Sequence, residues 1–232
     1  MYTETYGTGR PLVLLHGGYG APAMFGPVLT ALAAEHRVIA PHLRGHGRTP
    51  DADGPLTVSG MADDVATLID DLDGPAAILG FSLGGLVGLQ TAYRHPALVR
   101  RLVLVSTPFR HDGWDQPTRD GFEAMTASMA LMMQGTAAYA FFTRPPEEWP
   151  RFVGRMGRLL SREYDWTDEL ASLTVPVMVV VGDHDSVRPA HAVRYLDVLR
   201  DGRLAMLPET THYDIAGSPA LAATVIPFLR SG

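Results

Sequence analysis

The sequence predicts an α/β fold, with a mainly parallel twisted sheet and helices on both of its faces. The first observation is that short, continuous apolar runs such as Pro11–Leu15 and Val177–Val181 are typical of strands buried on both faces. The second is that segments with apolar residues at helical spacing stand between these runs, and alternating strands and helices form parallel sheets. With 232 residues, of which 46% are hydrophobic, the chain can bury a large core.

Each expected element rests on its own pattern. Thr57–Leu72 illustrates the helices, because its apolar residues recur every three or four positions and form one face. The expected strands are Pro11–Leu15, Arg37–Ala40, Ala76–Leu79, Leu102–Val105, Val177–Val181 and Arg203–Leu207. The expected helices are Ala23–His36, Thr57–Leu72, Leu83–Arg94, Pro189–Leu199 and Pro219–Leu229.

The alternation of strands and helices breaks once, between Pro108 and Thr174. This stretch contains no convincing strand, but it holds many methionines and aromatic residues among helix formers. We therefore predict a helical cap over residues 109–174, inserted in the second half of the chain. The core is expected to comprise residues 1–108 and 175–232.

Composition excludes several classes of function. The chain has 19 basic and 25 acidic residues, and a net charge of −6 disfavours binding to nucleic acid or to anionic membranes. It has no cysteine, so disulfides, thiolate metal sites and cysteine nucleophiles are absent. Two histidines, His184 and His191, are seven residues apart and lack the spacing of a helical zinc site. We expect a cytoplasmic protein with no targeting segment, no membrane anchor and no metal.

Residues that carry chemistry are expected at the carboxyl ends of the strands, where ligands bind in such sheets. The sequence Gly80–Gly85 contains a Gly-x-Ser-x-Gly pattern centred on Ser82, directly after one strand and directly before a helix. This is the setting of a nucleophile elbow, a strained turn whose glycines avoid clashes with the strand and the helix. The alternative is a serine that only caps the helix.

A serine nucleophile needs a base, and the base needs a carboxylate to orient it. His212 follows the strand Arg203–Leu207, and both Asp183 and Asp185 follow the strand Val177–Val181. The chain order is therefore serine, aspartate, histidine, an order known from one family of convergent triads. This pattern leaves both aspartates open as the acid.

With these features the sequence resembles the α/β-hydrolase superfamily, over nearly its whole length. The likeness is to capped serine hydrolases, a group of esterases, lactonases, carbon–carbon bond hydrolases and cofactor-free haloperoxidases. The resemblance implies that Ser82 is the nucleophile, His212 the base and Asp185 the acid, whereas Asp183 makes turn hydrogen bonds. It rests on His16-Gly17-Gly18, Arg44-Gly45-His46-Gly47-Arg48-Thr49, Gly80–Gly85, Gly182-Asp183-His184-Asp185 and His212.

Acyl transfer also needs two N–H groups that hold the oxyanion. One is expected from the backbone of Leu83, at the start of the helix. By the resemblance the other comes from Gly18, with Tyr19 as a weaker candidate, and His16 and His46 support the surrounding loops. The sequence departs from its relatives in two places: His42 stands where many carry aspartate, and at most one strand, Tyr2–Tyr6, precedes Pro11.

The resemblance implies an enzyme without a cofactor that hydrolyses a carboxylic ester, or a related lactone or thioester, of a small, largely apolar molecule. A serine at position 82 excludes the branches that need a carboxylate nucleophile, such as epoxide hydrolases. The residues expected to touch substrate are Tyr19, Phe81, Met129, Met133, Phe141 and Trp149. Two alternatives remain open: a carbon–carbon bond hydrolase or acyl-transfer enzyme on the same residues, and a ligand-binding protein that does not hydrolyse. The oligomeric state is not predicted.

Overall fold

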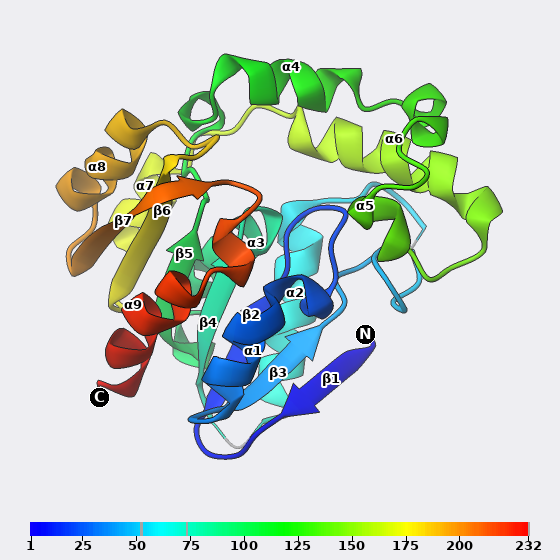
Figure 1. Cartoon of the computed structure of the whole chain (residues 1–232). Coiled ribbons are helices and arrows are strands. Elements are labelled where there is room, and N and C mark those ends of the chain that lie inside the picture. Colours follow the sequence, from blue (N-terminus) through cyan, green and yellow to red (C-terminus); the bar gives the residue numbers. More distant parts are fainter. Residues whose placement is uncertain (52, 73, 232) are drawn as a thin grey trace.

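The computed structural model describes residues 1–51, 53–72 and 74–231. In this part of the chain, seven strands form one sheet in the order β1-β3-β2-β4-β5-β6-β7 (Figure 1). All neighbouring pairs are parallel except β1 and β3, which confirms the mainly parallel sheet. The strands are β1 (Thr3–Tyr6), β2 (Pro11–Leu15), β3 (Arg37–Pro41), β4 (Ala76–Phe81), β5 (Val99–Val105), β6 (Val177–His184) and β7 (Gly202–Thr211).

Helices cover both faces of this sheet. Helices α1 and α9 pack on one face, and α2, α3 and α8 pack on the other. Their bounds are α1 (Gly26–Ala33), α2 (Val58–Asp70), α3 (Leu83–Arg94), α8 (Pro189–Val198) and α9 (Pro219–Arg230). The first helix begins later than its apolar spacing predicts, because Pro22–Phe25 forms a separate 3₁₀ turn and Gly26 adopts a positive φ of 44°.

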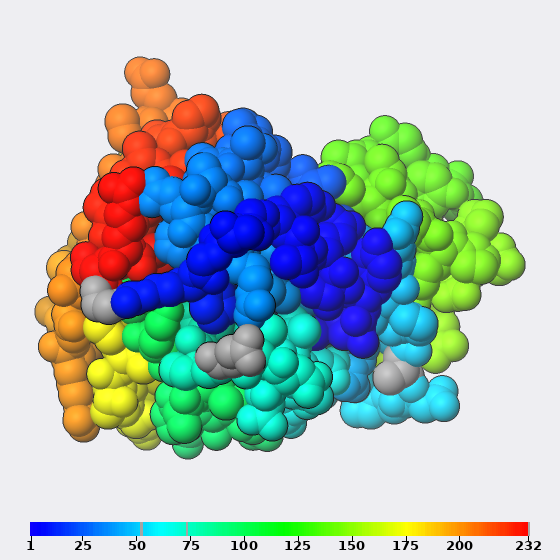
Figure 2. All heavy atoms as spheres, turned by 90° about the horizontal axis from the view of Figure 1, so that it is seen from below, coloured from blue at the N-terminus to red at the C-terminus, as the bar shows by residue number. Residues whose placement is uncertain are grey.

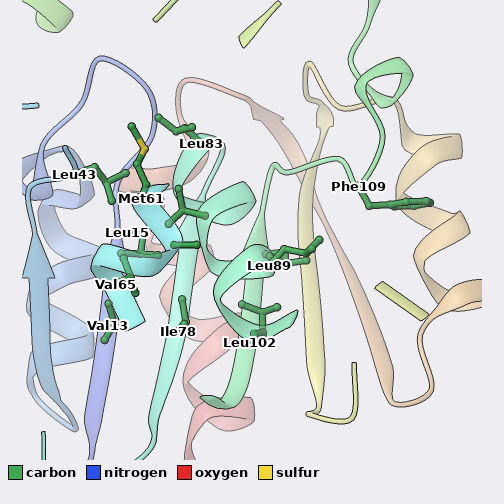
Figure 3. Close-up of a cluster of buried hydrophobic side chains, with 14 of the residues drawn as sticks. Val13, Leu15, Leu43, Met61, Val65, Ile78, Leu83, Leu89, Leu102 and Phe109 are labelled. Carbon is green, nitrogen blue, oxygen red and sulfur yellow. The ribbon is translucent and has the colours of Figure 1, made fainter. Parts of the chain in front are cut away.

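The core follows from the alternation of side chains along the strands. Val13, Ile78 and Leu102 stand in register on β2, β4 and β5 and point to the same face. Figure 3 shows Met61 and Val65 of α2 packed over this row. The intervening strand residues, such as Leu12 and Leu14, pack against α1 and α9 instead.

Residues 109–174, all of which the structure describes, contain helices and no strand. The helices are α4 (Gln116–Ala124), α5 (Ala137–Ala140), α6 (Trp149–Leu160) and α7 (Thr167–Ser172). In Figure 1, α4 and α6 lie above the sheet, whereas α7 packs beside it against α3 and α8. Seen from below, the yellow-green part of this segment projects beside the core (Figure 2). None of the described helices has the length and apolarity needed to cross a membrane.

Candidate active site

Ser82 lies in the turn between β4 and α3, with a positive φ of 53°. Two glycines make this turn possible. A Cβ atom on Gly80 would lie 2.3 Å from the carbonyl oxygen of Gly84, and one on Gly84 would lie 2.2 Å from the carbonyl oxygen of Leu15. Larger residues at either position would push the strand and the helix apart. The strained serine is therefore held at the carboxyl end of the sheet by close backbone packing.

The structure brings Ser82, His212 and Asp185 together. The Nε2 atom of His212 lies 3.2 Å from Oγ of Ser82, and its Nδ1 atom lies 2.9 Å from Oδ1 of Asp185. Because a carboxylate can only accept, Nδ1 carries the proton and Nε2 is free to accept from the serine hydroxyl. In this arrangement the imidazole can remove the serine proton.

Asp185 sits in a shell of hydrogen-bond donors, and its side chain is fully buried. Besides His212, its carboxylate accepts from the hydroxyl of Ser106, from the N–H of Gly182 at 3.2 Å and from the N–H of Val187 at 3.0 Å. Burial alone would raise the pKa of Asp185, but His212 and these donors outweigh it and lower that pKa. The carboxylate is therefore charged at neutral pH.

Asp183 performs a different task. Its Oδ1 atom accepts from the N–H of Thr210 at 3.0 Å, where β6 and β7 pair irregularly between Gly182 and His184. That bond joins the ends of the two strands, and none of the described hydrogen bonds joins Asp183 to His212. The irregular pairing also extends β7 to Thr211, beyond the strand that the apolar pattern predicts.

Gly18 and Leu83, expected to hold the oxyanion, lie side by side. A Cβ atom on Gly18 would lie 4.0 Å from Cβ of Leu83. Leu83 opens α3, so its N–H belongs to the first turn, whose donors have no partner within the helix. The N–H of Tyr19 is already directed to Nε2 of His46, at 3.3 Å. Of the two loop residues considered, Gly18 therefore fits the oxyanion role better than Tyr19.

Two buried histidines hold the loops around this position. His16 donates from Nδ1 to the carbonyl of Gly17 at 2.8 Å, and its Nε2 accepts from the N–H of Leu43 at 3.0 Å. Such a pattern requires a neutral ring, and burial lowers the pKa of His16 well below its usual value. Burial likewise lowers the pKa of His46 to about 4. Both histidines therefore shape the loops as neutral rings.

Of the residues expected to contact substrate, Phe81 lies near the reacting residues, whereas Tyr19 and Trp149 pack against each other. Phe81 is near the reacting atoms, since its ring centre lies 5.0 Å from that of His212. Trp149 is fully buried and donates to the carbonyl of Ala130 at 2.8 Å. The rings of Tyr19 and Trp149 pack together, with centres 6.3 Å apart. These two aromatic residues join α6 to the loop after β2.

Met129, Met133 and Phe141 belong to the same helical segment and are partly buried. Met133 packs against the hydrophobic cluster to which the buried residues of α6 belong. Among the described contacts, none joins these three side chains to Ser82 or His212. Their expected role in binding substrate is thus not supported by a direct contact with the reacting residues.

Sequence reasoning missed several residues around the site. A Cβ atom on Gly18 would lie 3.3 Å from Cε of Met156 and 3.6 Å from Cδ1 of Leu160. These two side chains therefore cover the loop, and the four-residue spacing of Phe152, Met156 and Leu160 on α6 was the available signal. Trp114, with its ring centre 5.5 Å from that of His212, carried no such signal.

A hollow of about 400 Å³ lies next to α3, on the side away from α1. Leu86, one turn after Ser82, lines it together with Leu160 and Trp114. Two of its lining residues also approach the site, because Leu160 lies against the Gly18 loop and the ring of Trp114 lies near that of His212. Among the described residues, no group of three or more His, Asp or Glu side chains could hold a metal ion.

Comparison with known proteins decides the family. A model of the alpha/beta hydrolase family matches residues 12–224. The chain belongs to this family. A relative from Aromatoleum aromaticum, named as a pimeloyl-acyl-carrier-protein methyl ester esterase, is 32% identical over 94% of this chain and 97% of its own length. Another, from Variovorax paradoxus, carries the name of a carbamate hydrolase, RutD, and is 30% identical over 99% of this chain and 96% of its own length.

The family's solved structures agree with this assignment. An esterase from Thermogutta terrifontis superimposes on this hydrolase with a TM-score of 0.80 and 25% identity, over 99% of this chain and 92% of the other. The relatives share the hydrolase fold and hydrolytic names, but those names point to different bonds. The enzyme is therefore a hydrolase of this family, and its substrate must be argued from its own site.

Proposed function

We propose that this hydrolase cleaves a carboxylic ester, or a related lactone or thioester, of a small, largely apolar substrate through an acyl-enzyme on Ser82. The observation that carries the proposal is the chain of contacts from Ser82 Oγ to His212 Nε2, at 3.2 Å, and from His212 Nδ1 to Asp185, at 2.9 Å. This geometry supplies a nucleophile, a base and an orienting carboxylate.

In the first half of the reaction, His212 takes the proton of Ser82 as Oγ bonds to the acyl carbon. The negative charge that develops on the carbonyl oxygen is held by the N–H groups of Gly18 and Leu83. His212 then gives the proton to the leaving alcohol or thiol as the bond from the acyl carbon breaks. The product of this half is an ester on Ser82.

In the second half, water takes the place of the leaving group. His212 removes a proton from that water, the hydroxide oxygen bonds to the acyl carbon, and the proton passes to Ser82 Oγ as the acyl ester breaks. The carboxylate of Asp185 stabilises the imidazolium in both halves without itself becoming protonated. Its lowered pKa suits this role, because the carboxylate stays charged.

We also infer that residues 109–174 act as the cap over this site. The inference is supported by the position of α4 and α6 above the sheet in Figure 1 and by the contact of Met156 and Leu160 with Gly18. Leu86, Trp114 and Leu160, which line the hollow of about 400 Å³ beside α3, then contact the apolar part of the substrate. Helix α7 packs against α3 and α8 and so connects the cap to the core.

Covalent labelling tests the proposed nucleophile. A fluorophosphonate probe should increase the mass of the wild-type protein by that of one phosphonyl group, and peptide mapping should place this group on Ser82. Ser82→Ala and His212→Ala should both abolish the label, because the first removes the nucleophile and the second removes its base. Ser172→Ala, at an exposed serine at the end of α7, is the matched control and should be labelled like the wild type.

Turnover then tests the reaction class. We expect the wild type to hydrolyse p-nitrophenyl butyrate, and Ser82→Ala to retain its fold by circular dichroism while losing turnover by a factor of about 10⁴ or more. Undiminished hydrolysis by the folded Ser82→Ala protein would refute the proposal. Comparison of butyrate esters, butyrolactone and butyryl thioesters then identifies the preferred bond.

A further inference from the structure

A second hollow, of about 430 Å³, lies between α6 and the loop before α2. Arg151, Arg155 and Arg158 line it from α6, at spacings of four and three residues that place them on one helix face. Arg162, just beyond the helix, lines it as well. The other described wall residues are Gly54, Pro55, Leu56 and Leu159, and none of the described lining residues is acidic. We call this the arginine hollow.

Arg155 is the buried arginine of the arginine hollow. It is 9% exposed, and its guanidinium donates to the carbonyl of Gly54 at 2.7 Å and lies 3.2 Å from the carboxylate of Asp51. Its charge is therefore balanced, and it ties α6 to the opposite wall. These contacts hold the two walls of the hollow together.

The other three arginines, Arg151, Arg158 and Arg162, have exposed side chains. Among the described residues, no carboxylate forms an ion pair with any of them. Three uncompensated positive charges thus face one hollow in a chain whose net charge is −6. Like charges on one helix face repel one another, and a bound anion would reduce that repulsion.

The arginine hollow also shares walls with the hollow of about 400 Å³ beside α3. Leu159 and Arg162 line both. The hollow beside α3 is lined further by Leu86, by Leu160, which lies against the Gly18 loop, and by the acidic residues Glu163, Asp165 and Glu169. An uncharged part of a ligand could therefore extend from the arginines, past Leu159 and Leu160, towards the Gly18 loop.

We propose that the arginine hollow binds the phosphate groups of a phosphorylated acyl substrate, the class to which acyl-coenzyme A thioesters belong. This proposal rests on the proposed function and specifies its substrate. Arg151 and Arg158 are two helical turns apart, a distance of about 10 Å, which suits several phosphate groups better than one carboxylate. Arginine binds phosphate through paired N–H groups, and Leu159, which lines both hollows, suits contact with an uncharged linker.

Binding is measured first, in the Ser82→Ala protein, so that turnover does not affect the result. Inorganic pyrophosphate and coenzyme A are titrated by calorimetry at low and at high salt. Both should bind, more weakly at high salt, and Arg158→Ser combined with Arg162→Ser should weaken binding by about tenfold or more. Arg200→Ser is the matched control, because Arg200 is an exposed arginine at the end of α8. The proposal would be overturned if neither pyrophosphate nor coenzyme A bound, or if Arg200→Ser weakened their binding as much as the double substitution does.

Kinetics then test what the phosphates do for a substrate. Butyryl-coenzyme A, butyryl-4′-phosphopantetheine and butyryl-pantetheine carry the same thioester and differ in their phosphates. KM should rise as phosphates are removed, and the double arginine variant should lose this discrimination. If one phosphate suffices, the phosphopantetheine and coenzyme A thioesters will have equal KM values. Equal KM for all three in the wild type would overturn the proposal.

Failure of the proposed function gives a different result from failure of this site. If pyrophosphate binding depends on Arg158 and Arg162 but no ester or thioester is hydrolysed, the anion site is supported and the hydrolytic reaction is refuted. If esters are hydrolysed and pyrophosphate does not bind, the hydrolytic reaction is supported and the anion site is refuted. The two measurements therefore separate the two proposals.

Discussion

The hydroxyl of Ser106 donates a hydrogen bond to Oδ2 of Asp185. Ser106 is fully buried just beyond β5. Its backbone has a positive φ of 49°, which residues other than glycine rarely adopt. The other carboxylate oxygen, Oδ1, receives Nδ1 of His212 at 2.9 Å. The carboxylate is thus held from both sides, so β5 helps to set the orientation of a histidine that follows β7.

This relationship predicts that Ser106 positions Asp185 rather than only filling space. Ser106→Ala and Ser106→Gly should both lower kcat for p-nitrophenyl butyrate by about tenfold, with little change in KM, because each removes a hydrogen bond to a charged group. Glycine also relieves the strain of the positive φ, so Ser106→Gly should be more stable than Ser106→Ala by about 1 kcal/mol in urea unfolding. A role in packing alone would leave kcat of the more stable glycine variant at the wild-type value.

The turn around Ser82 predicts a second, contrasting pair of variants. Gly84→Ala should lower the free energy of unfolding by about 3 kcal/mol or abolish folding, because its Cβ would lie 2.2 Å from the carbonyl oxygen of Leu15. Gly121→Ala is the matched control on α4, where no atom lies within 4 Å of the added methyl group. It should stabilise the protein by about 0.5 kcal/mol. Urea unfolding measures both, and equal effects of the two substitutions would contradict this account.

Much of this fold and site is predictable from sequence because the informative residues are local. A glycine-flanked serine between an apolar strand and a helix marks the turn at Ser82, and the residues after the strands mark Asp185 and His212. The structure brings these three together. Ser106 also follows a predicted strand, so the same rule extends to it, although hydroxyl residues after a strand are too common to single out alone.

Other features depend on packing that a single sequence does not encode in an obvious pattern. An aromatic residue such as Trp149 can line a pocket or fill a core, and only its buried contact with Ala130 shows the second. The length of β7 depends on its irregular pairing with β6, which no periodicity reveals. The arginine hollow likewise requires the loop before α2 to lie opposite α6.

The contact between Tyr19 and α6 gives a third prediction. The Tyr19 hydroxyl donates to the carbonyl of Val153 at 3.3 Å, and burial raises the pKa of Tyr19, so the group stays protonated. Tyr19→Phe keeps the ring packing and removes only this bond. We expect the free energy of unfolding to fall by about 1 kcal/mol, with kcat for small esters within about twofold of the wild type. A large loss of kcat would instead assign the hydroxyl to the reaction.

The last prediction concerns acid stability, which the buried histidines should control. Burial lowers the pKa of His46 and that of His191 to about 4. An unfolded histidine titrates near pH 6.5, so between about pH 6.5 and about pH 4 the unfolded chain binds protons that the folded chain does not. The free energy of unfolding should therefore fall as the pH drops through this window. Each such histidine should cost about 2 kcal/mol by about pH 5.

Variants at two histidines test the cause of this acid sensitivity. The Nε2 atom of buried His191 accepts from the N–H of Phe109 at 3.2 Å, an acceptor role that a glutamine oxygen can keep without titrating. His191→Gln should therefore reduce the loss of stability between about pH 7.5 and about pH 5, measured by urea unfolding at each pH. His184→Gln, at an exposed histidine, should leave that loss unchanged. A wild-type unfolding free energy that is constant over this range would show that the buried histidines are not the cause, because their neutral rings would then carry no proton linkage.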